Sequence, residues 1–88
     1  MQIRNIYDNG GETVDRYTIV YDEYATSTPG EELLLCLGMD GDPFHPQGFR
    51  QHSSYQDGAH LGKEIGFFDL PVPCQLAVMA DIGESIDF

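Results

Sequence analysis

Three histidines, two cysteines and one closely spaced pair of aspartates are the residues of this chain whose types could support chemistry. His45, His52 and His60 are spaced seven and eight residues apart. Two histidines that bind one metal ion from a helix lie three or four residues apart, so this spacing does not predict a zinc site. A site combining these histidines with Cys36 or Cys74 remains geometrically open. Otherwise we expect the histidines to bond loop backbone groups or to face solvent.

The aspartate pair, Asp40 and Asp42, flanks Gly41 and matches the start of a calcium-binding loop. Such a loop needs a third oxygen ligand two residues later and a glutamate at its twelfth position. Phe44 and Gln51 occupy those positions, so the sequence predicts no metal ion there. The two carboxylates can project from a turn toward a partner or bond local backbone N–H groups, and the sequence favours neither alternative.

The two cysteines lie in apolar surroundings. Cys36 is part of the run LLLCLGM, and Cys74 stands near the start of PCQLAVMA. Burial raises the pKa of a thiol, so neither residue is expected to be an activated nucleophile. We expect buried free thiols, with a disulfide or a metal ligand as the alternatives. Free thiols favour a reducing compartment, the cytoplasm.

No catalytic motif accompanies these residues. The sequence contains no GxSxG, HExxH, P-loop or GxGxxG pattern, so we expect no enzyme and no cofactor. The N-terminus shows no basic region followed by an apolar one, so no secretory signal is expected. The longest apolar run, Leu33 to Leu37, is five residues and too short to span a membrane.

Composition narrows the class of partner. The chain has 88 residues, with 4 Lys+Arg against 15 Asp+Glu, a formal net charge of −11. Phosphate contacts need clustered Lys and Arg, so direct binding to nucleic acid is not expected. An anionic membrane surface is disfavoured for the same reason. Hydrophobic residues make up 41%, which is enough for a single folded domain over residues 1–88.

The N-terminal part predicts a hairpin. Residues 2–8 alternate loosely, and residues 15–22 contain a run of β-branched and aromatic residues typical of a strand. Asn9-Gly10-Gly11 between them favours a turn, because these residues tolerate positive φ. On the second strand we expect one face to carry Tyr17, Ile19 and Tyr21.

The middle of the chain predicts a buried strand between two loops. Residues 24–32 have turn chemistry, whereas residues 33–39 form a continuous apolar run typical of a central strand. Residues 40–62 are rich in Gly, Pro, His and Ser and predict a long ordered loop with one short helical turn. The aromatic residues expected to pin this loop to the core are Phe44, Phe49 and Tyr55.

The C-terminal part predicts an edge strand over residues 63–68 and then a helix. Asp69 is the candidate N-cap, and the following prolines are tolerated in a first helical turn. The helix is expected to end at about Asp81 or Ile82. Its apolar stripe is expected to comprise Val72, Leu76, Met79 and Ala80, with Ile82 on its flank. One helix packed on a small antiparallel sheet makes an α+β fold.

The string PFHPQGF, residues 43–49, is the most distinctive in the chain. Two prolines and two phenylalanines predict a stiff apolar turn. It either closes one end of the core or serves as a protein-recognition surface, since aromatic and arginine residues anchor interfaces. In the second interpretation the contacts come from Phe44, His45, Phe49 and Arg50.

The few basic residues are not distributed evenly among the acidic residues of the chain. No Lys or Arg occurs between Tyr17 and Phe49, a span that holds Asp22, Glu23, Glu31, Glu32, Asp40 and Asp42. Eleven net charges correspond to about 19 Å of duplex DNA, the size of this domain. Such a surface can compete for a basic groove that normally holds nucleic acid. The alternative is a surface that is merely well solvated.

The segments GGETVDRYTIV, LGMDGDPFHPQGF and HLGKEIGFFDLPVPCQ resemble short acidic proteins of phages, plasmids and other mobile elements. The likeness runs from Ile3 to about Ile82. No activity is attached to that group, so no functional residue is carried over from it. The resemblance implies a genomic context in which small acidic proteins inhibit host defence systems, as anti-CRISPR proteins do.

These observations lead to three functional hypotheses. The first is an anti-CRISPR type inhibitor that binds a host defence effector and blocks its nucleic-acid channel by DNA mimicry. The second is a non-enzymatic interaction module of phage or plasmid physiology that binds through PFHPQGF, and the third is a small metalloprotein or enzyme using the histidines. A monomer is favoured over a dimer, although the strand at 63–68 offers a free edge. The expected partner-binding residues are Asp22, Glu23, Glu31, Glu32, Asp40, Asp42, Phe44 and Phe49.

Overall fold

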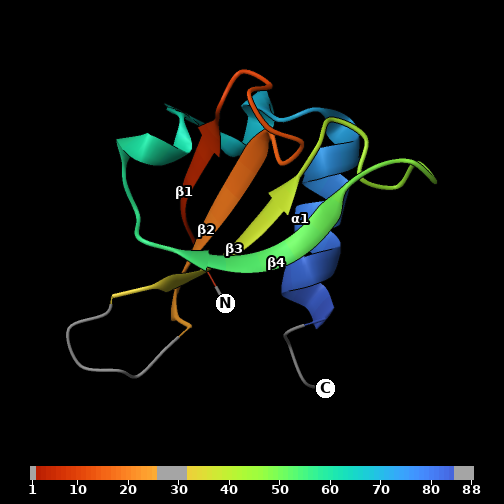
Figure 1. Cartoon of the computed structure of the whole chain (residues 1–88). Coiled ribbons are helices and arrows are strands. Elements are labelled where there is room, and N and C mark those ends of the chain that lie inside the picture. Colours follow the sequence, from red (N-terminus) through yellow and green to blue (C-terminus); the bar gives the residue numbers. More distant parts are fainter. Residues whose placement is uncertain (1, 26–31, 85–88) are drawn as a thin grey trace.

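A five-stranded antiparallel sheet and one long helix form the framework of the structure, a computed structural model that describes residues 2–25 and 32–84. In chain order the elements are β1 (Ile3–Asp8), β2 (Tyr17–Tyr24), β3 (Leu34–Met39), β4 (Arg50–Tyr55), the 3₁₀ turn η1 (Ala59–Leu61), β5 (Lys63–Ile65), the 3₁₀ turn η2 (Phe67–Asp69) and α1 (Val72–Glu84). The strands are ordered β4-β3-β2-β1-β5, and α1 lies on one side of the sheet (Figure 1). The predicted α+β class is confirmed.

β1 and β2 form the predicted hairpin, in which Ile6 lies opposite Ile19. Gly10 and Gly11 have φ angles of 78° and 90°, a region that glycine occupies without steric cost. The side-chain oxygen of Asn9 accepts the backbone N–H of Gly11 and closes the turn. The Asn-Gly-Gly signal therefore predicted both the position of the turn and its cause.

β3 is the central strand that its apolar run predicted. It pairs with β2 on one side and with β4 on the other, and its residues are almost all buried. Leu37 packs in the core beneath α1, whereas Cys36 packs on the opposite face of the sheet. Both faces are covered, which explains why this strand has no alternation of polar and apolar residues.

The prediction of a long ordered loop over residues 40–62 is wrong for residues 50–55. Residues 50–55 form β4, which pairs with β3 along its whole length and places His52 opposite Leu37. The sequence RQHSSY carries no strand signal, because β4 is an edge strand with mostly exposed side chains. The extended conformation of β4 is determined by its pairing with the apolar β3 and not by the local propensity of its residues. The short helical turn expected in this segment is η1.

Residues 56–62 cross the sheet from β4 at one edge to β5 at the other, on the face away from α1. Tyr55 and Leu61, at the two ends of this crossing, pack against the small cluster of buried residues on that face. Gly62 has a φ angle of 129°, and a Cβ there would lie 2.5 Å from the carbonyl oxygen of Asp8. Only glycine lets the crossing segment approach β1 this closely.

The helix begins later than the proposed N-cap. The carboxylate of Asp69 accepts the backbone N–H of Gly66 at 2.8 Å and so closes η2 instead of capping α1. The backbone N–H of Gln75 donates to the carbonyl of Pro71 at 3.1 Å, and α1 starts at Val72. The prediction of Asp69 as the helix N-cap is therefore wrong, because its carboxylate bonds the backbone of η2, the turn that precedes α1.

The apolar stripe proposed for the helix is also wrong in its main members. Val72, Leu76 and Met79 are exposed, and so is Ala80; only Ile82 packs against the core. The buried face instead comprises Cys74, Ala77 and Val78, together with Leu70 before the helix. The helix is apolar on two faces, and the sheet covers only one of them.

Both cysteines are buried free thiols, as expected. Burial raises the pKa of Cys36 and raises that of Cys74 to about 11, so neither is a thiolate at neutral pH. The Sγ of Cys74 donates to the carbonyl of Asp40 at 3.1 Å, which ties the start of α1 to the end of β3. Among the described residues, no helix has the length and apolar character needed to cross a membrane.

Candidate functional site

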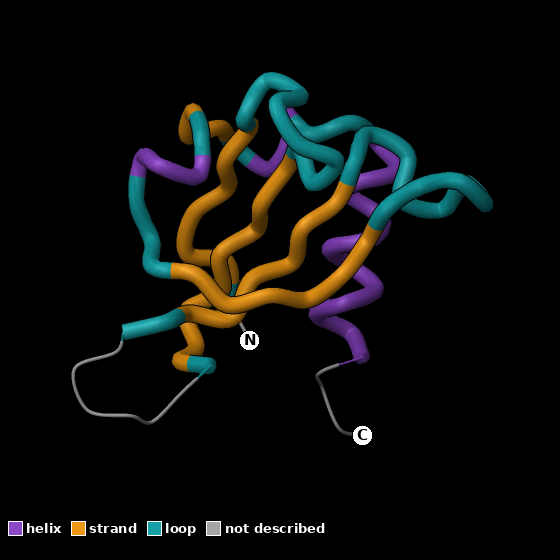
Figure 2. The backbone as a smooth tube through the Cα atoms, viewed as in Figure 1, coloured by secondary structure: helices purple, strands orange, loops and turns teal. Residues whose placement is uncertain are grey.

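The expected acidic contact residues lie at two opposite ends of the sheet. Asp22 and Glu23 are at the end of β2 and Glu32 precedes β3, whereas Asp40 and Asp42 follow β3. The six residues of β3 separate the two groups by about 20 Å at the usual rise of a strand. Figure 2 shows the loops that follow β1 and β3 at one end, and the end of β2 at the other. Glu31 lies outside the described residues.

The first group includes a single arginine, and we call it the acidic end: Asp22, Glu32 and Asp57 near Arg4, together with Glu23, which follows Asp22 on β2. Arg4 bonds Asp22 through Nη1 at 3.3 Å and Asp57 through Nε at 3.2 Å. A cleft of about 330 Å³ opens beside it, with Glu32, Asp57 and Tyr24 in its wall. One guanidinium cannot neutralise four carboxylates, so the acidic end stays negative.

Asp57 is the residue of this group that sequence reasoning missed. Its carboxylate accepts bonds from the Tyr7 hydroxyl and the Asn5 side-chain amide, both at 2.7 Å, and from Arg4. Burial alone would raise the pKa of Asp57, but these three donors outweigh it and lower the pKa below its usual value. The donors belong to β1, about fifty residues earlier in the chain, so the residues near Asp57 in the sequence do not predict these contacts. Burial and, to a lesser extent, the hydrogen bond to the Asp57 carboxylate raise the pKa of Tyr7 to about 12.

The second group is partly used for local structure. The carboxylate of Asp40 accepts the backbone N–H of Asp42 at 3.0 Å, which is the turn-bonding alternative. Asp42 is exposed. Asp15, from the β1–β2 loop, lies against Gly38 near the same end of β3. This end also carries Arg16, which bonds Asp8 at 2.9 Å, and its charge is therefore more balanced.

The PFHPQGF loop is compact, and the Phe44 ring is exposed on its surface. A Cβ on Gly48 would collide with the carbonyl oxygen of Asp42, so the two ends of the loop are in contact. Phe49 is half-buried, but Phe44 is exposed, and the expectation that it pins the loop to the core is wrong. The Arg50 guanidinium carbon lies 5.0 Å from the centroid of the Phe44 ring, a cation–π distance.

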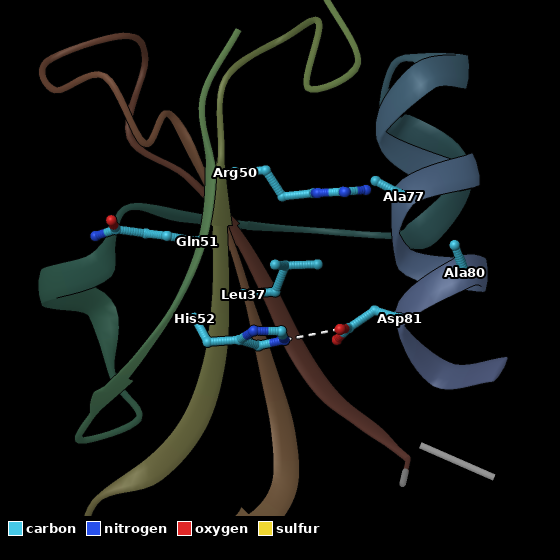
Figure 3. Close-up of a pocket in the computed structure, with 7 residues that line it drawn as sticks. All are labelled: Leu37, Arg50, Gln51, His52, Ala77, Ala80 and Asp81. Atoms are coloured by element: carbon cyan, nitrogen blue, oxygen red, sulfur yellow. Dashed lines mark hydrogen bonds and ion pairs between the residues drawn. The ribbon is translucent and has the colours of Figure 1, made fainter. Parts of the chain in front are cut away.

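A second cleft, of about 200 Å³, lies between β4 and α1. Figure 3 shows Arg50, Leu37 and His52 pointing from the sheet toward the helix, while the Gln51 side chain points away. Nε2 of His52 lies 2.7 Å from Oδ1 of Asp81. The His52 side chain is 53% exposed and that of Asp81 only 10%. The prediction that the histidines bond loop backbone or face solvent therefore missed this pair.

Behind the pair lies a third polar group, the hydroxyl of Tyr21. This hydroxyl and the second carboxylate oxygen of Asp81 are both buried, and among the described residues neither has a hydrogen-bond partner of good geometry. Burial raises the pKa of Tyr21 far above its usual value, and the neighbouring Asp81 carboxylate raises it further. A carboxylate that orients an imidazole is also the arrangement of a general base. A general base of this kind needs a nucleophile to activate, and the described residues that line the cleft include no serine, threonine or cysteine.

The other two histidines do not join this cleft. Nδ1 of His45 accepts the backbone N–H of Gln47 at 3.1 Å, as expected of a loop histidine, and His60 is exposed. Within residues 2–25 and 32–84, no three His, Cys, Asp or Glu side chains lie close enough together to hold a metal ion. Comparison of the chain with protein family models, with curated proteins and with solved structures finds no match.

Proposed function

We propose that this chain is a non-catalytic inhibitor of the anti-CRISPR type. It binds a host effector protein whose nucleic-acid channel is lined by Lys and Arg, and the acidic end is part of its contact surface. The observation that carries this proposal is the arrangement around Arg4. Its guanidinium is already engaged by Asp22 and Asp57, while Glu23 and Glu32 are exposed and form no ion pair within the part of the chain that the structure describes.

The electrostatics of this group support binding to a basic groove. Asp57 and Asp22 are held by Arg4, so part of the negative charge is fixed in position before any partner arrives. Preorganised charge costs less conformational entropy on binding than charge on free side chains. Opposite charge on the partner accelerates association, and the complex weakens as salt screens the surfaces.

The proposal is tested with a charge-reversed variant and a matched control. The variant carries Glu23→Lys and Glu32→Lys; the control carries Glu12→Lys and Glu64→Lys, two exposed acids outside the acidic end and outside the expected contact residues. Both change the net charge by the same amount. Tagged proteins are used to capture partners from bacterial lysate at low and moderate salt, and any captured effector is assayed for displacement of a labelled DNA or RNA.

The expected result is salt-sensitive capture of a nucleic-acid-dependent effector by the wild type and by the control, with loss in the acidic-end variant. The wild type should also displace the labelled nucleic acid. Equal loss in both variants would mean that net charge alone acts, and unchanged capture by the acidic-end variant would refute the proposal. Circular dichroism of both variants checks that the fold survives.

A second candidate function rests on the exposed Phe44 ring and its stacking on Arg50. Aromatic and arginine side chains commonly anchor protein interfaces. In this case the chain is an interaction module that binds through PFHPQGF. Capture would then persist at raised salt and be abolished by Phe44→Ala, while the acidic-end variant would behave as the wild type.

A further inference from the structure

The sheet ends on one side at β4, whose outer edge pairs with no other strand of the described residues. β4 is the last strand in the order β4-β3-β2-β1-β5 (Figure 1), and it pairs with β3 along all six of its residues. We call the side of β4 that points away from β3 the outer edge.

The pairing with β3 shows which backbone groups of β4 point toward the outer edge. The backbone N–H of Asp40 donates to the carbonyl of Phe49 at 3.1 Å, in the register that continues with Met39 opposite Arg50. Hydrogen-bonded pairs alternate with unbonded pairs along an antiparallel ladder. The residues of β4 that bond β3 are therefore Gln51, Ser53 and Tyr55. Those whose backbone groups point outward are Arg50, His52 and Ser54, and all three are exposed.

The outward N–H and C=O groups of these three residues form no hydrogen bond within the part of the chain that the structure describes. They recur at every second residue, which is the spacing of the donors and acceptors along an extended strand. Another extended backbone can satisfy all of them at once, as in the recognition of a peptide by strand addition. The outer edge therefore specifies the conformation of what it binds.

The two edges of the sheet differ in how well they are protected against such pairing. Edge strands are commonly protected by short length, by Lys or Pro, or by a bulge. β5 has only three residues, and two of them are Lys63 and Glu64. β4 is twice as long, contains neither Lys nor Pro, and keeps an unbroken register with β3. β4 is therefore the edge that is open to an added strand.

The charge along β4 indicates which strand fits best. Residues 43–56 contain no Asp or Glu, in a chain of net charge −11. The Arg50 guanidinium packs over the Phe44 ring and forms no ion pair among the described residues. A carboxylate directly opposite Arg50 on an added strand would therefore be favourable. At the other end of β4 the chain continues to Asp57 of the acidic end, so a carboxylate there would be repelled.

A second copy of the chain is a poor match for this edge. The symmetric antiparallel register that uses all the outward groups places Arg50 opposite Ser54 and His52 opposite the same residue of the copy. The strand RQHSSY offers no carboxylate to Arg50 in that arrangement. Pairing would also bring together two molecules of net charge −11.

We propose that the outer edge of β4 binds an extended segment of a partner protein as an added antiparallel strand. The segment carries a carboxylate opposite Arg50 and none near Tyr55. Its backbone bonds the outward N–H and C=O groups of Arg50, His52 and Ser54. The inference goes beyond the proposed function and holds whether or not the acidic end binds an effector.

The test uses short capped peptides in which Thr and Val alternate and the last residue is Glu, which faces Arg50 in the antiparallel pairing. One derivative is N-methylated at the residues that face the outward groups of β4, and its matched control is N-methylated at the alternate residues. A third derivative has Lys in place of Glu. Binding is measured by calorimetry, and the exchange of each amide hydrogen of β4 is followed by NMR.

The protein variants form a second matched pair. Ser54→Pro removes an outward N–H that makes no bond to β3, whereas Ser54→Ala removes the same hydroxyl and keeps that N–H. Arg50→Gln tests the charge. Circular dichroism checks the fold of each variant, and the methylated peptides test strand pairing on the wild type even where Ser54→Pro fails to fold.

In the free protein the amides of Arg50, His52 and Ser54 should exchange faster than those of their neighbours in β4. The parent peptide should slow the exchange of these three by about tenfold or more. Methylation at the facing residues should abolish binding, and methylation at the alternate residues should leave it. Ser54→Pro should weaken binding by about tenfold relative to Ser54→Ala, and the Lys peptide and Arg50→Gln should each weaken it by a smaller factor.

Slow exchange of the three outward amides in the free monomer would overturn the proposal, because the chain itself would then cover the edge. Protection that rises with protein concentration, together with a dimer in sedimentation, would overturn it in favour of a second copy. Equal binding of the two methylated peptides would show that the peptide does not pair as a strand. Absence of binding by the parent peptide at millimolar concentration would also refute the proposal.

Discussion

Nε2 of His52 and Oδ1 of Asp81, 29 residues apart in the sequence, lie 2.7 Å from each other and join the edge strand β4 to the helix α1. The two partners differ in burial: the His52 imidazole is half exposed, whereas the Asp81 carboxylate is almost completely buried. This asymmetry determines what each substitution should do.

Loss of the histidine is expected to cost more stability than loss of the aspartate. His52→Ala leaves a buried carboxylate unpaired, which costs about 1–3 kcal/mol or more when the group is charged. Asp81→Ala leaves an imidazole that water can reach, and should cost less. Urea unfolding of both single variants and of the double variant measures the difference and the coupling energy. His60→Ala is the control, and equal losses at His52 and Asp81 would contradict this account.

Tyr21→Phe should be neutral or should stabilise the protein by up to about 1 kcal/mol. The hydroxyl of Tyr21 is buried close to the Asp81 carboxylate but makes no well-aligned hydrogen bond within the described residues, so its removal abolishes a desolvated polar group without breaking a well-formed bond. The ring stays in the core beneath α1. Thermal and urea unfolding give the sign of the effect. A loss above about 1 kcal/mol would mean that the hydroxyl bonds Asp81 in solution.

Local residue pattern was sufficient to predict most of the fold. The Asn-Gly-Gly turn, the β-branched β2 and the apolar β3 are each specified by nearby residues. The turn and β3 lie where they were expected, but β2 runs over Tyr17–Tyr24 instead of 15–22, and the strand predicted at 63–68 ends at Ile65. β4 was missed because its residues are polar and its conformation comes from pairing with β3. The buried face of α1 was misassigned because the helix has apolar residues on two faces. Long-range contacts such as that of Cys74 with Asp40 decide which face meets the sheet.

The candidate sites were only partly predictable, for a related reason. The excess of acid in residues 22–32 is visible in the sequence, and its described members are exposed at one end of the sheet. Asp57 and the pair of His52 and Asp81 depend on partners that are 29 to 53 residues away. No spacing rule connects residues that only sheet pairing and helix packing bring together.

Asp57→Asn should destabilise the protein by about 1–3 kcal/mol at neutral pH. The amide that replaces one carboxylate oxygen is itself a donor, and it would face the donors of Tyr7, Asn5 or Arg4. Tyr7→Phe removes only one of these bonds and should cost less. Unfolding by urea at pH 7 measures both variants. A loss in Asp57→Asn below that of Tyr7→Phe would contradict the role of this network.

The same substitution should change how stability depends on pH. The pKa of Asp57 is lower in the folded protein than in the unfolded chain, so the unfolded state binds more protons at acid pH. The contribution of Asp57 is therefore complete above about pH 5 and disappears as the pH falls through and below about 4. Wild type should lose stability in that window, and Asp57→Asn should lose less. Some dependence remains in the variant, because the Arg16 hydrogen bond also lowers the pKa of Asp8.

Gly62→Ala should destabilise the fold by about 2–4 kcal/mol, whereas Gly41→Ala should have little effect. Gly62 has φ of 129°, and an added Cβ would lie 2.5 Å from the carbonyl oxygen of Asp8, a backbone atom that cannot rotate away. Gly41 has no positive φ, and none of the described residues has an atom within 4 Å of the position that its Cβ would take. Because residues 56–62 also carry Asp57, the loss at Gly62 should be accompanied by weaker protection of the Tyr7 region in hydrogen exchange. Similar stability of the two alanine variants would mean that the crossing segment does not hold this path over the sheet.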